Sequence, residues 1–338
     1  MSEAGVAQLA AASSGFGEFP GRDAWEAARI VVGELSVPYL PLLPERGVQA
    51  TDVGRTTALL TDFPVEVGPH GYRIASRAGA DGKRAADFLA QDVDALEEVL
   101  ERDGRSGGAV SVEALGPLSL AVVLELANGH HVLSDRGALR DLAASLADGL
   151  RSHVAELRRR LRADVVLRLR EPALDDVLGG GVATVSGLGT LPALPTNAAV
   201  ELLRPFADVG AAGLVVACPV SASALAALRE LPGAGLWAAA AQLDPTRYDE
   251  LGWFFEAGRT VGLGLVPERH PTRPPSVKEL IAPALALVDL LGFPRSVLAR
   301  QVYATSAKGF APESGAWAAK ALRLVARAAS ALAEESAA

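Results

Sequence analysis

An apolar run near the middle of the chain ends in residues that could take part in chemistry. In Val166-Leu167-Arg168-Leu169-Arg170-Glu171-Pro172, residues 164–169 are predicted to form a strand, so that Arg170 and Glu171 follow its carboxyl end. A carboxylate can exchange protons with a substrate, and a guanidinium group can bind an anion. A structural alternative is equally open, in which Glu171-Pro172 caps the strand and sets the turn.

Short β-rich runs alternate with longer helical patterns along the whole chain, as expected for repeated βα units. The predicted strands are the segment ending at Ser14-Gly15-Phe16-Gly17 and residues 37–40, 109–114, 164–169, 213–217, 235–239, 260–266 and 301–305. The clearest helix is predicted over residues 135–162, where leucines recur every three or four positions and Ser134 is the expected N-cap. This pattern predicts an α/β fold with a single (β/α)8 TIM barrel.

Composition limits the classes of function. The chain has 338 residues, which we treat as one domain (1–338) with a flexible N-terminus at residues 1–10, and its formal net charge is −8. An acidic balance opposes tight binding to nucleic acid or to anionic membranes. The first residues lack the pattern of a secretory signal, and no apolar run reaches the roughly 18 residues of a spanning helix, so we expect a cytoplasmic protein.

Two further features invite functional interpretations that the sequence does not favour. Cys218 is the single cysteine and follows an apolar strand, which favours a buried thiol over a nucleophile. Gly179-Gly180-Gly181 is not followed by the Gly-Lys-Ser/Thr of a phosphate-binding loop, which favours an ordinary mobile loop.

Several motifs, in order and at similar spacing, resemble the cobalamin-independent methionine synthase family. The likeness is to short, single-barrel, actinobacterial-type proteins similar to the catalytic half of that enzyme, within the uroporphyrinogen decarboxylase and methionine synthase superfamily. The motifs are Gly15-Phe16-Gly17-Glu18-Phe19-Pro20-Gly21, Leu43-Pro44-Glu45-Arg46-Gly47, Asp52-Val53-Gly54-Arg55-Thr56, Val112-Glu113-Ala114-Leu115-Gly116-Pro117, Glu171-Pro172-Ala173-Leu174, Val261-Gly262-Leu263-Gly264-Leu265-Val266-Pro267 and Thr305-Ser306-Ala307-Lys308-Gly309. The resemblance implies a (β/α)8 barrel.

The resemblance also implies a zinc-dependent reaction, the transfer of a methyl group from methyl-folate to a zinc-bound homocysteine thiol. The family's ligand positions fall near Ala217, Pro219, Ala239 and Lys308, none of which is a usual zinc ligand. A one-residue slip would place Cys218 at the site, but a single thiol does not make a zinc site. We therefore expect no metal and no other cofactor, and describe the zinc site as degenerate.

The residues at the positions of the family's amino-acid subsite also differ from the family pattern. The resemblance places substrate-binding positions at Gly17, Glu18 and Arg170, where the family has a serine at the position of Glu18 and an acid at that of Arg170. A substrate ammonium group facing Arg170 would meet a like charge, which opposes binding of homocysteine.

Two hypotheses follow from these substitutions. In the first, the chain is a non-catalytic family member, a pseudoenzyme candidate that binds a small molecule or a protein partner. In the second, a metal-free enzyme acts on a small anionic substrate, which Arg170 and Lys308 recognise while Glu171 and Glu18 supply acid and base; Glu171 and Lys308 are the catalytic candidates. The second requires Glu18, Arg170, Glu171 and Lys308 to converge in an open cavity that neither Trp237 nor Phe310 fills.

Overall fold

The computed structural model describes residues 9–69 and 71–337. Its centre is a curled sheet of six parallel strands in the order β3-β5-β6-β7-β8-β9. The strands are β3 (Ala109–Leu115), β5 (Asp164–Arg170), β6 (Gly213–Ala217), β7 (Gly235–Ala239), β8 (Val261–Val266) and β9 (Val302–Ser306). Strands β6, β7 and β8 are continuously apolar and buried, as expected for parallel strands covered on both faces, whereas β3 and β5 also carry charged residues.

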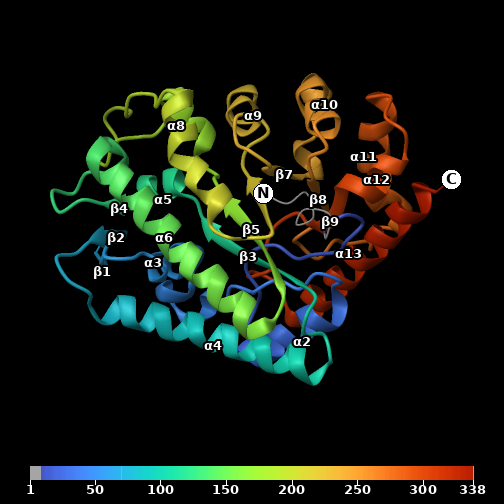
Figure 1. The fold of residues 1–338 in the computed structure, drawn as a ribbon, viewed down its shortest axis with the longest axis horizontal. Coiled ribbons are helices and arrows are strands. Elements are labelled where there is room, and N and C mark those ends of the chain that lie inside the picture. The colour runs from blue at the N-terminus through green and yellow to red at the C-terminus, as the bar shows by residue number, and fades with distance from the viewer. Residues whose placement is uncertain (1–8, 70, 338) are drawn as a thin grey trace.

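Helices surround this sheet on its outer side (Figure 1). The described residues contain twelve: α2 (Ala24–Glu34), α3 (Asp52–Ala58), α4 (Ala80–Arg102), α5 (Pro117–Val123), α6 (Arg136–Leu161), α7 (Leu174–Gly179), α8 (Thr196–Leu203), α9 (Ala222–Arg229), α10 (Tyr248–Glu256), α11 (Val277–Leu290), α12 (Ser296–Gln301) and α13 (Gly315–Glu335). None of them is both long enough and apolar enough to cross a membrane.

Two predicted strands take a different form in the structure. We call residues 11–18 the first bridging segment and residues 37–42 the second bridging segment. Single parallel bridges join Ser13 to Ala304 of β9, Ser14 to Val37, and Tyr39 to Ser111 of β3. These two segments therefore run between the edge strands β9 and β3, but each is paired at isolated residues and neither is a regular strand.

The longest helix follows the predicted range closely, with a different cap. Helix α6 begins after Asp135, whose carboxylate accepts hydrogen bonds from the amides of Gly137 and Ala138. The expected cap, Ser134, instead donates its hydroxyl to the carbonyl of His131. Asp135 and not Ser134 caps the helix, because Asp135 directly precedes the first helical residue, Arg136. The helix ends at Arg162, which adopts a left-handed conformation.

A small second sheet was not expected from the sequence. Its strands β1 (Val65–Gly68), β2 (Gly71–Ile74) and β4 (Leu124–Glu125) lie in the order β1-β2-β4, where β1 and β2 are antiparallel. They lie at one end of the molecule, away from the curled sheet (Figure 1). Of the N-terminal segment 1–10 expected to be flexible, residues 1–8 lie outside the described residues, and Leu9 is buried.

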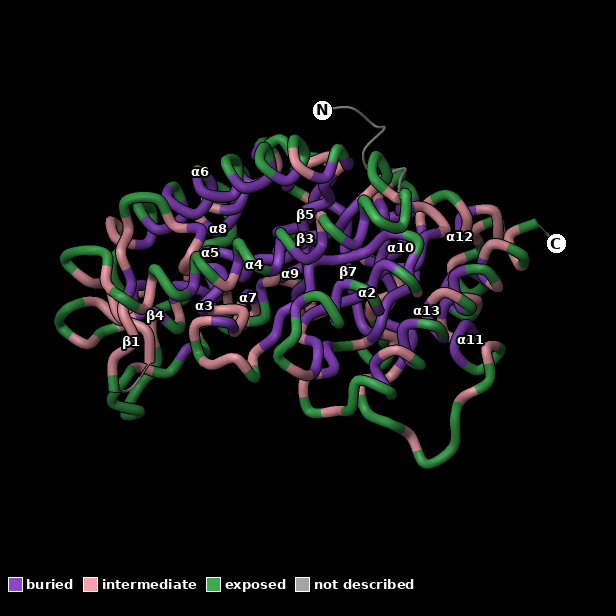
Figure 2. Tube along the Cα trace, turned by 90° about the horizontal axis from the view of Figure 1, so that it is seen from below, coloured by how far each residue is buried: buried purple, intermediate pink, exposed green. Residues whose placement is uncertain are grey.

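The apolar core has two parts. The larger cluster fills the space between the sheet and the helices, and the smaller one lies inside the curl of the sheet. Figure 2 shows the buried residues running through the middle of the molecule, with exposed residues on the outer helix faces and loops. The smaller cluster includes Phe16, Ala217, Trp237, Ala239 and Tyr303.

Candidate functional site

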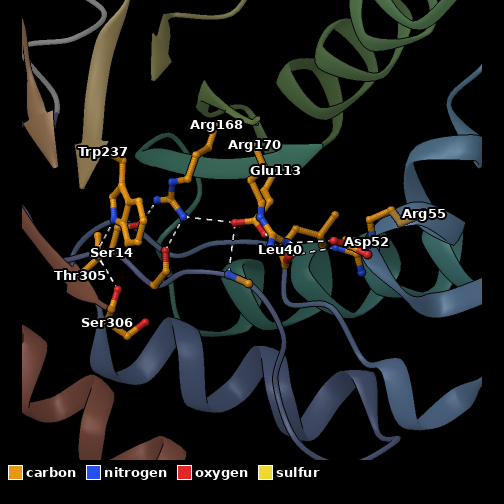
Figure 3. A network of polar contacts seen from close by, with 12 residues as sticks. Ser14, Leu40, Asp52, Arg55, Glu113, Arg168, Arg170, Trp237, Thr305 and Ser306 are labelled. Atoms are coloured by element: carbon orange, nitrogen blue, oxygen red, sulfur yellow. Dashed lines mark hydrogen bonds and ion pairs between the residues drawn. The ribbon is translucent and has the colours of Figure 1, made fainter. Parts of the chain in front are cut away.

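Five charged side chains gather at the carboxyl ends of β3 and β5. The cluster, called here the strand-end cluster, consists of Glu18, Asp52, Glu113, Arg168 and Arg170. Figure 3 shows the last four of these side chains. Glu113 of β3 stands directly opposite Arg168 of β5 in the parallel register. Arg168 and Arg170 are two positions apart and so point to the same face. Both guanidinium groups lie over the ring of Phe16, at 5.1 and 5.5 Å from its centre.

The inner half of the cluster is buried and fixes the first bridging segment. Arg168 is 1% exposed; its Nη1 donates to the carbonyl of Gly15 at 2.6 Å and lies 3.4 Å from Glu113 Oε2. The same Oε2 accepts a hydrogen bond from the amide of Gly17 at 3.1 Å. A buried charge needs such partners, because an unpaired one is strongly destabilising. The Arg168–Glu113 pair therefore holds Gly15 and Gly17 in place.

The outer half of the cluster reaches solvent. Arg170 Nη1 lies 3.3 Å from Asp52 Oδ2 and 3.4 Å from Glu113 Oε1, and the Arg170 and Asp52 side chains are 19% and 26% exposed. Glu18 is half-buried, and burial raises the pKa of its carboxyl, with Asp52 and Glu113 adding to the rise and Arg170 opposing it. With three carboxylates and two guanidinium groups, the cluster carries an excess of acid.

Glu171 has a different environment. Its side chain is fully buried, and its carboxylate accepts hydrogen bonds from the amide of Leu118 at 3.0 Å, the amide of Ser119 at 2.7 Å and the Ser119 hydroxyl at 2.6 Å. These amides belong to the first turn of α5, where backbone N–H groups have no partner within the helix. Burial raises the pKa of Glu171 to about 7, although the three hydrogen bonds lower it. The Glu171 carboxylate thus caps α5.

Lys308 lies in the loop after β9, and its side chain is exposed. Within residues 9–69 and 71–337, no hydrogen bond or ion pair of this side chain is found. The backbone beside it is tightly placed, since a side chain on Gly309 would come within 2.2 Å of the Glu18 amide nitrogen. Phe310 donates its amide to the Glu18 carbonyl at 2.6 Å. Of the four residues expected to converge, the structure brings together Glu18 and Arg170.

Aromatic side chains occupy the interior next to the cluster. The Trp237 ring stacks on Phe16 with 4.0 Å between ring centres and 11° between ring planes, and its Nε1 donates to Thr305 Oγ1 at 2.8 Å. Phe310 is fully buried. Trp237 therefore fills space beside Arg168, as Figure 3 shows.

The positions implied for zinc carry no suitable donor set. Ala217 and Ala239 belong to the core cluster inside the curl, so their methyl groups face the interior. Cys218 instead belongs to the cluster between sheet and helices, and burial raises the pKa of its thiol. In the described part of the chain, no group of three or more His, Cys, Asp or Glu residues is arranged to hold a metal ion. The residues present therefore do not fit zinc at the implied site.

Three members of the cluster, Asp52, Glu113 and Arg168, received no role from the sequence. A signal was present for two of them, because Glu113 and Arg168 are charged residues within otherwise apolar strands, and buried charges need partners. Asp52 gave no such signal. It stands at the start of α3, and only the folded chain brings it to Arg170.

Comparison with known proteins places the fold. No protein-family model matches the sequence, and no curated protein matches it either. Among solved structures, the chain is similar to a methyltransferase from Methanosarcina mazei, with a TM-score of 0.54 and 12% identity over 92% of this chain and 83% of that one. It is also similar to a protein from Listeria monocytogenes provisionally described as a vitamin-B12-independent methionine synthase, with a TM-score of 0.52 and 14% identity over 94% of this chain and 96% of that one. The fold of this chain is thus similar to methyltransferase and methionine synthase-like folds.

Proposed function

We propose that this protein is a methionine synthase-like barrel that binds a small polar molecule at the strand-end cluster and does not carry out zinc-dependent methyl transfer. The observation that carries the proposal is the position of Arg170, which lies partly exposed between Asp52 and Glu113 at the carboxyl ends of the strands. Ligands of barrels of this type bind at that end. In the proposed arrangement, the two bridging segments complete the ring of eight between β9 and β3.

The residues at the implied zinc-ligand and catalytic positions support the proposal that this chain lacks the zinc-dependent methyl transfer of the family. The methyl groups of Ala217 and Ala239 cannot donate electron pairs to a metal, and Lys308 is a cation in the loop. Glu171 uses its carboxylate on the amides of α5 and on Ser119. A substrate thiol at this site would therefore have no metal to lower its pKa, and the Glu171 carboxylate would not be free to interact with it.

The charges of the cluster indicate the chemistry of the ligand. Glu18, Asp52 and Arg170 are the members that are not fully buried, and Arg170 already faces two carboxylates. The acid excess favours a ligand with a cationic or hydrogen-bond-donating group and opposes a simple anion. Small size is favoured because Trp237 and Phe16 fill the space below.

A metal-free enzyme remains the second candidate, and one observation favours it. Glu18 is half-buried beside Asp52 and Glu113, and burial and these carboxylates raise the pKa of its carboxyl, so that it holds a proton more readily than an exposed glutamate and could exchange it with a ligand. Glu18 would then act as acid or base on a ligand held by Asp52 and Arg170.

The experiment has two parts, the first of which identifies what the protein carries. Native mass spectrometry and elemental analysis of the protein purified from its own host report any retained small molecule and any metal. We expect a small polar molecule and much less than one zinc per chain. About one zinc per chain, together with methylation of homocysteine, would overturn the proposal.

The second part locates the binding site. Thermal unfolding is measured with a library of small amines, zwitterions and anions on the wild type, Asp52→Asn and the matched control Glu34→Gln. Glu34 is similarly exposed, at 21%, and is also paired with an arginine, but it lies at the end of α2. Stabilisation that Asp52→Asn loses and Glu34→Gln keeps supports the site. Stabilisation that both variants keep places the ligand elsewhere.

A further inference from the structure

The loop between β9 and α13 lies against the part of the first bridging segment that carries Glu18. A β-carbon on Gly309 of this loop would come within 2.2 Å of the Glu18 amide nitrogen and 2.8 Å of its carbonyl oxygen. In the other direction, a β-carbon on Gly17 would lie 3.2 Å from the Gly309 nitrogen and 3.3 Å from its α-carbon. The two backbones are therefore in contact, and a side chain on Gly309 would not fit between them.

Hydrogen bonds hold the backbone around Glu18 on two sides. On the β9 side, the Phe310 amide donates to the Glu18 carbonyl at 2.6 Å, and the Phe310 side chain is fully buried. On the other side, Glu18 forms a parallel bridge with Leu42 of the second bridging segment, where the Phe19 amide donates to the Leu42 carbonyl at 2.7 Å. Because Phe310 and Leu42 are both buried, these contacts leave the backbone of Glu18 little room to move.

The Glu18 carboxylate is placed by the same contact. A β-carbon on Gly309 would lie 2.8 Å from Glu18 Oε2, so the carboxylate packs against the α-carbon of Gly309. Apart from the backbone amide of Glu18 itself, no hydrogen-bond donor to this carboxylate is found in the described part of the chain. Asp52, Glu113 and Arg170 act on it through their charges. The position of the carboxylate is therefore set by the backbone of Glu18 and by the lack of a side chain on Gly309.

We propose that Gly309 is a positioning residue for Glu18, which keeps the Glu18 carboxylate at the half-buried place where a ligand of the strand-end cluster meets it. Glycine is needed at this position for space and not for its backbone conformation, because the φ angle of Gly309 is not positive. This inference rests on the proposed function, since the placement of Glu18 matters for binding only if a ligand occupies the cluster.

The first test compares two alanine substitutions and needs no ligand. Gly309→Ala adds the methyl group that would collide with Glu18, whereas the control Gly315→Ala adds one at the start of α13, where nothing lies within 4 Å. Carboxyl carbon NMR follows the titration of Glu18 in the folded proteins. In Gly309→Ala we expect the carboxylate to move toward solvent and its pKa, which burial raises, to fall toward the ordinary value of glutamate. In Gly315→Ala the titration of Glu18 should match the wild type.

A second, milder pair of variants decides the matter if Gly309→Ala does not fold. Gly17→Ala places a methyl group 3.2 Å from the Gly309 nitrogen, a contact that the loop relieves by moving a few tenths of an ångström. Gly17 has a φ of +72°, and Gly21→Ala is the control because Gly21 has a φ of +89° and nothing within 4 Å. Both variants carry the strain of alanine in the left-handed region, so a shifted Glu18 titration in Gly17→Ala alone supports the contact. A wild-type titration in Gly17→Ala would overturn it.

The last test connects the position of Glu18 to binding. The probe is ethanolamine, a small cation with a hydroxyl group, and calorimetric titration gives its dissociation constant. Gly309→Ala should raise this constant at least about tenfold, and Gly315→Ala should leave it unchanged. Equal affinity of the wild type and Asp52→Asn would overturn the proposed function, whereas the Glu18 titration would still decide the role of Gly309. A folded Gly309→Ala protein with a wild-type Glu18 titration would overturn the positioning role, even if its melting temperature fell, because the contact would then serve stability alone.

Discussion

Two acidic regions lie at the same end of the sheet and serve different purposes. In the Glu171 region, one carboxylate meets three donors from a single helix and is closed to solvent. In the strand-end cluster, three carboxylates and two guanidinium groups come from several segments, and the contacts of Arg170 are long, at 3.3 and 3.4 Å. In the first arrangement burial closes the carboxylate to a ligand, whereas in the second Glu18, Asp52 and Arg170 reach the surface.

This comparison shows why a motif residue should be judged by its partners. Glu171 has the motif and the raised pKa that suggest catalysis, yet every hydrogen bond of its carboxylate supports α5 or the turn that precedes it. Glu18 has a weaker sequence signal, but its side chain is only half-buried and lies beside Asp52, Glu113 and Arg170. The inner part of the cluster, Arg168 with Glu113, resembles the Glu171 region because it is buried and ties backbone segments together.

The largest effect is expected from breaking the buried pair of the cluster. Arg168→Met should lower the free energy of unfolding by about 3–5 kcal/mol, because buried Glu113 would lose one of its two arginine partners and the Gly15 carbonyl would lose its donor. Urea unfolding measures the change. The double variant Arg168→Met with Glu113→Gln should recover part of the loss, since no buried charge remains. Equal stability of the single and double variants would show that the pair is not electrostatically coupled.

The Glu171 region should be the next most sensitive. Glu171→Ala leaves the amides of Leu118 and Ser119 without acceptors, which should cost about 3 kcal/mol in the free energy of unfolding. Glu171→Gln keeps an acceptor oxygen and should cost about 1 kcal/mol. A change below about 0.5 kcal/mol for Glu171→Ala would return Glu171 to the list of functional candidates.

The pH dependence of stability separates the two regions further. Burial raises the pKa of Glu171 from 4.5 to about 7, so between these values the folded protein holds a proton that the unfolded chain releases. The contribution of Glu171 to stability is therefore fully present below pH 4.5, falls as the pH rises, and is lost above about 7. The slope should reach about 1.4 kcal/mol per pH unit at most. Glu171→Gln should remove this slope, as seen by comparing urea unfolding of both proteins from pH 5 to 7.5.

The smallest effect concerns the outer half of the cluster. Arg170 lowers the pKa of Glu18, so Arg170→Gln should raise that pKa further. Carboxyl carbon NMR of the labelled protein follows the titration. Arg162→Gln, at the end of α6, is the control and should leave Glu18 unchanged. An unchanged Glu18 in Arg170→Gln would mean that the two groups do not interact in solution.

Much of the fold could be predicted from local patterns. The six regular strands and helix α6 match the predicted ranges within a few residues, because their apolar patterns are strong. The bridging segments were predicted as strands, but each makes only isolated bridges. Their partners lie far away in sequence, and a local pattern does not show how long such a pairing extends.

The site was predictable only in part, for a physical reason. The sequence identified Arg170 and Glu18 as positions at strand ends, and the structure places both in one cluster. It could not show that Glu171 points toward α5, because alternate residues of a strand face opposite sides and the turn after β5 sets the direction. Nor could it show that Asp52 meets Arg170, since that contact joins residues from distant parts of the chain.

The bridge between Ser13 and Ala304 has a consequence for how the protein is made. The first bridging segment leaves the ribosome before all six strands of the curled sheet, whereas its partner β9 emerges only after the other five. Arg168 and Glu113 can meet before then, but the hydrogen bonds of the first bridging segment to β9 cannot form. During synthesis this segment must therefore stay unpaired on that side, and a nascent chain halted before β9 should expose it to proteases and chaperones.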